Sequence, residues 1–564
     1  MVSGDFNTLL QAPSPPNWSA LPEDKIYLER LPVTGTTLFG RDEQLNLLDE
    51  VWEKNDTNVL SFIAWGGVGK STLVNKWLEQ MRTDNYRGAQ RVYAWSFYSQ
   101  GTTERATSAD LFIAEALKWF GDSDPNAGSP WDKGERLANL IRHERTLLVL
   151  DGVEPLQSAH AHERGKLKDP ALLVLLEALA RDNPGLCLIS TRERLTDLDA
   201  LAGSRRFSAA SSSDRVSVQQ IDLEKLSPAS ARALLRAGGV RGSDAELEAG
   251  AATFGCHALA LNLLIEYLRD IPGHAIAEAA KIPALDLPPD QQKDEAPRRM
   301  IDTLARKLDT GPELNVLRML GLFDRPADKD SLDALRAEPV IVGLTDHLGI
   351  TQEANWLRAV QRLRQYKLLA EMSHHAPDEL DAHPLVREHF ADQLQRTLLT
   401  AWKKGNLRLD EHLTHSTKEF PDTVEEMAPL FAAVAHGCAA DLQQQAFNDV
   451  FVRRIRRGTE QFLPKKLGAF GADLAALSGY FATPWHVPSV ALTEAARTFV
   501  LNDTGVDLRA LGRLREAAQP LQSSLDISLA RAEWKDTAIS KRSDPDAGQS
   551  APSACRCLAK CGTG

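Results

Sequence analysis

The first long part of the chain, residues 39–215, alternates short apolar runs with segments whose apolar positions repeat at helical spacing. The apolar runs predict buried strands, and the periodic segments between them predict amphipathic helices. The expected strands are 59–65, 91–98, 146–151 and 185–190, and the expected helices are 71–82, 108–120, 134–143 and 170–181. This alternation is typical of a parallel sheet with helices on both faces.

The pattern changes several times in the rest of the chain, which predicts a multidomain α/β plus α protein. Residues 1–38 are proline-rich and weakly periodic, as in an extended leader. Residues 216–298 predict a helical domain that ends in a Pro/Asp-rich linker. Residues 299–398 predict a winged-helix domain, because a short hairpin, LLAEMS and LDAH, follows several helical segments. Residues 399–540 predict only helices, as in an incomplete TPR-like repeat.

The end of the chain, residues 541–564, loses this apolar periodicity and predicts a disordered tail. Its cysteines, Cys555, Cys557 and Cys561, lack the paired spacing and the fourth ligand of a zinc site. The preceding helices stop in mid-repeat without a capping unit. We interpret the C-terminus as a repeat array that was truncated or frameshifted.

Composition fits a cytoplasmic protein with several cores. The chain has 564 residues, 43% of them hydrophobic, and 65 Lys and Arg against 77 Asp and Glu. This net charge of −12 argues against nucleic-acid binding as the main activity, but it leaves room for a local basic patch. No apolar run has the length of a membrane span, and the N-terminus lacks the features of a signal peptide.

The stretch VLSFIAWGGVGKST, residues 59–72, predicts a phosphate-binding loop between a strand and a helix. Glycines let backbone N–H groups turn toward an anion, and the helix N-terminus adds partial positive charge. Lys70 can reach the β- and γ-phosphates, whereas Ala64 stands where the motif usually has its first glycine. A glycine-rich turn with a surface lysine is the alternative, and it explains the flanking elements less well. We expect ATP or ADP to contact the whole loop: Gly66, Gly67, Val68, Gly69, Lys70, Ser71 and Thr72.

A second motif, LLVLDGVEPL at residues 147–156, predicts a buried strand that ends in Asp151. At the carboxyl edge of the sheet this carboxylate can hold Mg²⁺ together with the Ser71 hydroxyl. Glu154 follows three residues later and can polarise the attacking water. Without the phosphate loop upstream, a turn-forming Asp-Gly would be the simpler interpretation.

The next strand ends in Ser190-Thr191-Arg192. At this edge of the sheet, the Arg192 guanidinium would face the γ-phosphate and could sense its presence. The alternative is a solvated arginine at the start of a loop.

The order of these motifs resembles the NB-ARC/NACHT class of signal-transduction ATPases, the STAND proteins. The segments that carry the resemblance are FGRDE, AWGGVGKST, LLVLDGVE, STRE, GCHALAL and DAHPLVREHF, which together span about residues 38–395. The resemblance implies an ATP/ADP-binding switch whose slow, Mg²⁺-dependent hydrolysis gates a conformational change or oligomerisation. It also implies that an unidentified protein or ligand acts as the trigger on the helical repeats.

The resemblance implies roles for three further residues. Arg41 lies in the segment that contacts the adenine side, and Ala258 occupies the position where the family has a proline that packs on the base. His383 matches the histidine that, in relatives, contacts the ADP phosphate from the winged-helix domain and holds the closed state. Here the preceding methionine is replaced and Pro384 follows.

Two other functions fit parts of the sequence. A nucleotide-dependent transcriptional regulator would use the winged helix to read DNA, and residues 453–457, RRIRR with Val452 before them, offer a basic stretch outside that domain. A metabolic P-loop ATPase or kinase would share the phosphate loop, but no substrate-binding segment is recognisable. Salt-dependent DNA binding would support the first function, and rapid multiple turnover the second.

Overall fold

The computed structural model describes residues 18–35, 37–97, 108–158, 163–201, 217–285, 292–308 and 311–530. The predicted tail at 541–564 lies outside these residues, as do residues 1–17 and 36 of the predicted leader.

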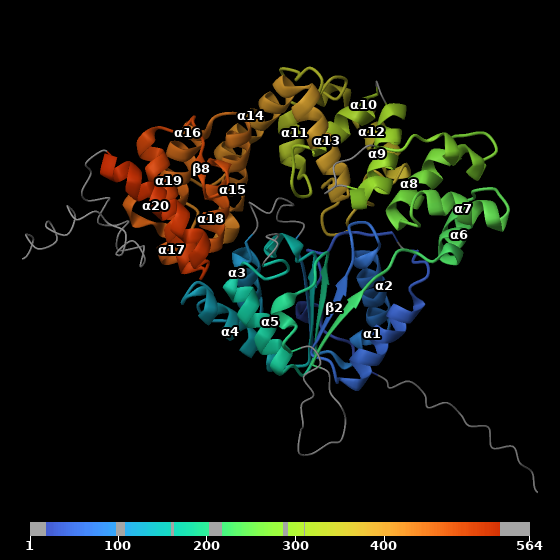
Figure 1. The fold of residues 1–564 in the computed structure, drawn as a ribbon, viewed down its shortest axis with the longest axis horizontal. Coiled ribbons are helices and arrows are strands. Elements are labelled where there is room, and N and C mark those ends of the chain that lie inside the picture. Colours follow the sequence, from blue (N-terminus) through green and yellow to red (C-terminus); the bar gives the residue numbers. More distant parts are fainter. Residues whose placement is uncertain are drawn as a thin grey trace, which may run out of the picture.

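A six-stranded parallel sheet, in the order β1-β3-β4-β5-β2-β6, forms the centre of the first domain (Figure 1). The strands are β1 (Ile26–Tyr27), β2 (Val59–Ile63), β3 (Arg91–Ser96), β4 (Thr146–Asp151), β5 (Leu186–Thr191) and β6 (Val218–Asp222). The four strands predicted from apolar runs are therefore present, and the predicted α/β sheet is confirmed.

Helices cover both faces of this sheet (Figure 1). They are α1 (Asp42–Lys54), α2 (Lys70–Thr83), α3 (Asp110–Trp119), α4 (Pro130–Arg142) and α5 (Pro170–Arg181). Alternate residues of one strand serve two cores, since Val92 and Ala94 pack with α1 and α2, while Tyr93 and Trp95 pack with α3 to α5. This two-sided burial explains why the central strands read as continuous apolar runs.

The two edge strands have weaker sequence signals. β1 has only two residues and lies in the segment predicted as an extended leader. β6, with the sequence VQQID, is only partly buried and lies beyond residue 215, where helices were expected. The sheet thus extends past both predicted boundaries of the domain, because pairing with β3 and β2 fixes segments that have little apolar periodicity of their own.

A helical region follows the sheet and shares one continuous core from Leu226 to Leu409. Its helices are α6 (Pro228–Ala237), α7 (Asp244–Thr253), α8 (Ala258–Arg269), α9 (Glu295–Lys307), α10 (Pro312–Leu320), α11 (Lys329–Arg336), α12 (Glu353–Gln365) and α13 (Pro384–Thr397). Among the described residues no single helix is both long and apolar enough to cross a membrane, although α7 and α8 pass that test together across a bend of 116°.

In place of the predicted hairpin before α13, the structure has only isolated backbone hydrogen bonds. The Ala370 N–H donates to the Asp381 carbonyl at 2.8 Å, and Ala327 and Leu380 form an antiparallel bridge. No strand longer than an isolated bridge forms between residues 311 and 398, all of which the structure describes. Isolated backbone contacts therefore stand where the sequence predicts the two strands of the hairpin.

The C-terminal region consists of paired helices. They are α14 (Leu399–Ser416), α15 (Val424–Ala439), α16 (Gln443–Gln445), a π-helix (Ala446–Ile455), α17 (Phe462–Lys466), α18 (Phe470–Ser478), α19 (Glu494–Ala510) and α20 (Leu514–Ala530). The expectation of an entirely helical region is wrong in one place, because β7 (Phe481–Thr483) and β8 (Val487–Pro488) form an antiparallel hairpin. A tight turn brings the Phe481 and Trp485 rings edge to face, a local contact that apolar periodicity does not report.

The basic stretch at 453–457 is bonded within this region. Each of its four arginines has an internal partner, and the partners are Glu419, Asp422, Asp473, Asp503 and the backbone carbonyls of residues 414 and 417–419. The stretch therefore braces the helices and gives no support to a DNA-binding surface.

The C-terminal helices return to the sheet domain and lie next to α3 and α4 (Figure 1). The Ala472 N–H at the start of α18 donates to Asp110 Oδ2 at 2.8 Å, and Lys133 Nζ donates to the Leu467 carbonyl at 2.5 Å. Asp110 and Lys133 are both buried. The C-terminal helical region thus packs back onto the sheet domain at α3 and α4.

Candidate nucleotide-binding site

The glycine-rich loop connects β2 to α2. Gly67 and Gly69 have φ of 73° and 104°, a region that favours glycine, and Gly69 is the N-cap of α2. A Cβ at Gly67 would lie 2.8 Å from His257 Cε1 and 2.9 Å from Leu259 Cβ. Backbone shape and close packing therefore both require glycine at position 67.

Lys70 opens α2 and is buried at the base of the loop. Its ammonium donates to the Ala64 carbonyl at 2.5 Å and to the Trp65 carbonyl at 3.2 Å, and burial lowers its pKa. Ala64 packs in the core next to α2, and its φ is not in the left-handed region. A methyl group is thus accommodated where the motif usually has glycine.

Asp151 is the last residue of β4, and hydroxyl groups of neighbouring elements surround its carboxylate. The Ser71 hydroxyl donates to its two oxygens at 2.9 and 3.1 Å, and the Ser190 hydroxyl also donates to it. Ser96, its register partner on β3, lies 3.4 Å away. Burial raises the Asp151 pKa, although these hydroxyl groups lower it.

This donor set fits a divalent cation. Asp151 and Ser71 offer only oxygen atoms, which Mg²⁺ prefers, and the carboxylate is fully buried beside the phosphate loop. A cation here would stabilise the charged form of Asp151, which burial otherwise disfavours. Ser71 and Asp151 are therefore the two residues that could hold Mg²⁺.

Glu154 and Arg192 contact each other. Arg192 Nε lies 2.9 Å from Glu154 Oε1, and a Cβ built on Gly66 would lie 3.3 Å from Arg192 Nη2. The guanidinium thus spans from Glu154 to the phosphate loop. The structure brings both residues to the carboxyl edge of the sheet, where the sequence predicts them.

Arg41 lies behind the loop. It is buried, and its guanidinium donates to the Val68 carbonyl at 3.2 Å and to the Glu224 carbonyl at 2.6 Å. Arg41 does not line the adjoining cavity, whereas Phe39, two residues earlier, does. Its geometry is that of a brace between the loop and the chain leaving β6.

The start of α8 packs on the phosphate loop, and the sequence predicts only one of the residues involved. Ala258, the first residue of α8, lines the cavity, as the resemblance implies. Its neighbours make the closer contacts, because His257 Nε2 lies 2.9 Å from the Gly66 carbonyl and the Leu259 N–H donates to the Gly67 carbonyl at 3.1 Å. The signal for His257 is its place directly before an apolar helix, inside the GCHALAL segment.

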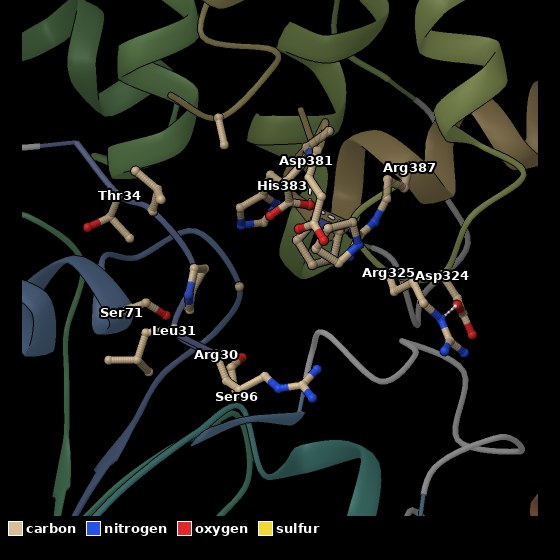
Figure 2. A pocket seen from close by; sticks show the side chains of 18 of the residues that line it. Arg30, Leu31, Thr34, Ser71, Ser96, Asp324, Arg325, Asp381, His383 and Arg387 are labelled. Atoms are coloured by element: carbon tan, nitrogen blue, oxygen red, sulfur yellow. Dashed lines mark hydrogen bonds and ion pairs between the residues drawn. The ribbon is translucent and has the colours of Figure 1, made fainter. Parts of the chain in front are cut away.

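His383 faces the same cavity from the far side, across from Ser71 and Ser96 (Figure 2). It is the N-cap of α13, and its Nδ1 accepts the Leu385 N–H at 3.2 Å. Burial, with help from the nearby Arg192, His257, Arg387 and Lys70, lowers its pKa to about 3. The ring is therefore neutral, and its proton resides on Nε2.

The cavity has a volume of about 1240 Å³ and lies between the sheet, the helical region and the C-terminal helices. Such a volume is ample for a nucleotide. Predicted site residues that line it are Gly66, Gly67, Gly69, Lys70, Ser71, Thr72, Arg192, Ala258 and His383. Those that do not line it are Arg41, Val68, Asp151 and Glu154, which contact these residues or the loop from behind.

One family model matches the part of the chain that holds the phosphate loop, Asp151 and Glu154. Residues 41–158 match the family model described as the NB-ARC domain. This part of the chain is similar to NB-ARC domains. For this part, the predicted resemblance to NB-ARC-type P-loop ATPases is confirmed.

Solved structures give weaker likenesses to the whole chain. A STAND protein with a tetratricopeptide repeat sensor from Pyrococcus horikoshii is 15% identical, with a TM-score of 0.47 over 91% of this chain and 68% of that one. A Walker-type ATPase of Pyrococcus abyssi is 14% identical, with a TM-score of 0.30 over 64% and 98%. The ORC1 protein of Aeropyrum pernix, in complex with DNA, is 18% identical, with a TM-score of 0.31 over 64% and 96%. No curated protein matches the sequence.

Proposed function

We propose that this protein is an ATP/ADP-binding switch of the STAND type. One observation carries the proposal: Lys70 from the phosphate loop, Arg192 directly after β5 and His383 at the start of α13 line a single cavity. A nucleotide in that cavity would contact the sheet domain and the helical region at once. Its phosphates can therefore bias how the two are arranged.

The sheet side would bind the triphosphate. The loop N–H groups and Lys70 hold the phosphates, and Ser71 with Asp151 holds Mg²⁺, which when bound neutralises charge on the β- and γ-phosphates. Glu154 orients the attacking water. Arg192 would contact the γ-phosphate, and since it already pairs with Glu154 at 2.9 Å, the γ-phosphate competes with Glu154 for the guanidinium.

The helical side would distinguish ADP from ATP. The neutral His383 donates from Nε2 to the ADP phosphate and stabilises the closed arrangement, in which the winged-helix-like region, residues 299–398, covers the nucleotide. ATP with Mg²⁺ favours a second arrangement through Arg192 and Asp151. Turnover is slow in this scheme, because the bound nucleotide is the signal.

The C-terminal helices α14 to α20 would receive the trigger. They contact α3 and α4 through Asp110 and Lys133, so a protein or ligand that displaces them would free the sheet domain. In the ATP-bound form the freed surface would allow homo-oligomers to assemble.

The proposal is tested first at Lys70. Lys70→Ala should abolish ADP and ATP binding, measured by calorimetry, because it removes the only side-chain cation that the loop itself supplies. Far-UV circular dichroism should stay unchanged, which shows that the fold is intact. A variant that binds nucleotide as tightly as wild type would refute the assignment of the phosphate loop.

A further inference from the structure

The start of α8 fixes two consecutive carbonyl groups of the phosphate loop. His257 Nε2 lies 2.9 Å from the Gly66 carbonyl, and the Leu259 N–H donates to the Gly67 carbonyl at 3.1 Å. In a planar trans peptide, the N–H points opposite to the C=O. Holding these two carbonyls therefore turns the N–H groups of Gly67 and Val68 away from α8.

The hydrogen bond to Gly66 defines the state of the imidazole. A carbonyl only accepts, so Nε2 of His257 carries the proton and donates. Burial lowers the pKa of His257 to about 4, so the ring stays neutral. Its Nδ1 is buried and has no hydrogen-bond partner within the described parts of the chain.

The contact is also tight. His257 is 1% exposed, and a Cβ on Gly67 would meet its Cε1 at 2.8 Å. The ring therefore packs directly against the loop as well as bonding to it. Any displacement of α8 from the sheet must release the Gly66 and Gly67 peptides together.

We propose that His257 is a positioning residue that pre-orders the phosphate loop, so that docking of α8 and binding of nucleotide phosphates strengthen each other. The inference rests on the proposed nucleotide switch. Coupling of this kind is reciprocal: what loosens α8 weakens phosphate binding, and bound nucleotide holds α8 on the loop. His257 acts through the loop backbone.

The test uses two variants of the full chain. His257→Ala removes the donor, whereas His257→Gln keeps a side-chain N–H that can reach the Gly66 carbonyl. The readout is the Kd for ADP, measured by calorimetry, together with the melting temperature without nucleotide. We expect His257→Ala to weaken ADP binding about tenfold, equivalent to 1.4 kcal/mol, and His257→Gln to restore most of the affinity.

His436→Ala is the matched control, because desolvation likewise lowers the pKa of His436 to about 4, but its ring bonds to Asn406 in the C-terminal helices. It should lower the melting temperature without changing the Kd. Equal affinities of wild type and His257→Ala, or equal losses in the Ala and Gln variants, would overturn the inference. Failure of wild type to bind ADP, or unchanged binding by Lys70→Ala, would instead overturn the proposed function.

Discussion

At the scale of single residues, the site depends on one buried carboxylate. Asp151 accepts hydrogen bonds from Ser71 and Ser190, while burial raises its pKa. A protein does not ordinarily bury a carboxylate without compensation. The hydroxyl groups supply part of that compensation, and in our account Mg²⁺ supplies the rest.

Changes at this site should separate hydrolysis from binding. Asp151→Asn keeps an acceptor for the Ser71 hydroxyl but removes the charge, so single-turnover hydrolysis with Mg²⁺ should fall about a hundredfold or more. Glu154→Gln should slow hydrolysis by about 10²-fold or more, as expected for a lost water-orienting base. ADP binding without Mg²⁺ should stay within about twofold of wild type in both variants. Unchanged hydrolysis rates in both variants would refute these assignments.

Local sequence is enough to predict site residues that lie on a strand or in the loop directly after it. Lys70, Ser71 and Asp151 follow directly from an apolar run and the polar residues that end it. His257 and Phe39 reach the loop or the cavity because separate segments dock there. Apolar periodicity does not predict that docking, and only the segments FGRDE and GCHALAL point to these two places. Arg41 was predicted near the adenine, and the structure has it bracing Val68 from behind.

At the scale of elements, local sequence again predicts what is buried by its own apolar residues and misses what depends on a partner. The central strands β2 to β5 are buried on both faces, so continuous apolar runs in the sequence are enough to predict them. The edge strands β1 and β6 are defined by their partners, and their residues carry too few apolar side chains to be recognised. The hairpin of β7 and β8 depends on a tight turn and one aromatic contact.

In the contact between α3, α4 and the C-terminal helices, buried charged side chains form hydrogen bonds with backbone groups at helix ends. Asp110 accepts the Ala472 N–H at the start of α18, and Lys133 donates to the Leu467 carbonyl at the end of α17. Each charge complements the helix dipole that it meets. The contact is thus favourable only while both helices remain docked.

Asp110→Ala should loosen this contact. Loss of a buried, charge-assisted hydrogen bond costs about 1.5–3 kcal/mol. Amide exchange in α18, followed by mass spectrometry, should therefore accelerate about 10- to 100-fold while exchange in β2 to β5 stays unchanged. Glu135→Ala, at an exposed position on α4, is the control and should leave exchange in α18 as in wild type. Exchange in α18 that is equally slow in both variants would show that Asp110 does not hold the C-terminal helices.

At the scale of the whole molecule, the sheet domain, the helical region and the C-terminal helices all line the same cavity. The sheet supplies the phosphate loop, α8 supports that loop, and His383 faces it from α13. The C-terminal helices return to α3 and α4. Such an arrangement lets a ligand in the cavity and a partner on the outer helices influence one another.

The central claim is that bound ADP holds the molecule closed through His383. The most direct measurement is the rate at which ADP dissociates from wild type and from His383→Ala, followed by stopped-flow fluorescence. His389→Ala is the matched control on the same helix, because His389 does not line the cavity. Loss of the imidazole contact should speed ADP release about 10- to 100-fold, the equivalent of one hydrogen bond to a charged group, while His389→Ala releases ADP as wild type does. Identical rates for His383→Ala and wild type would contradict the account.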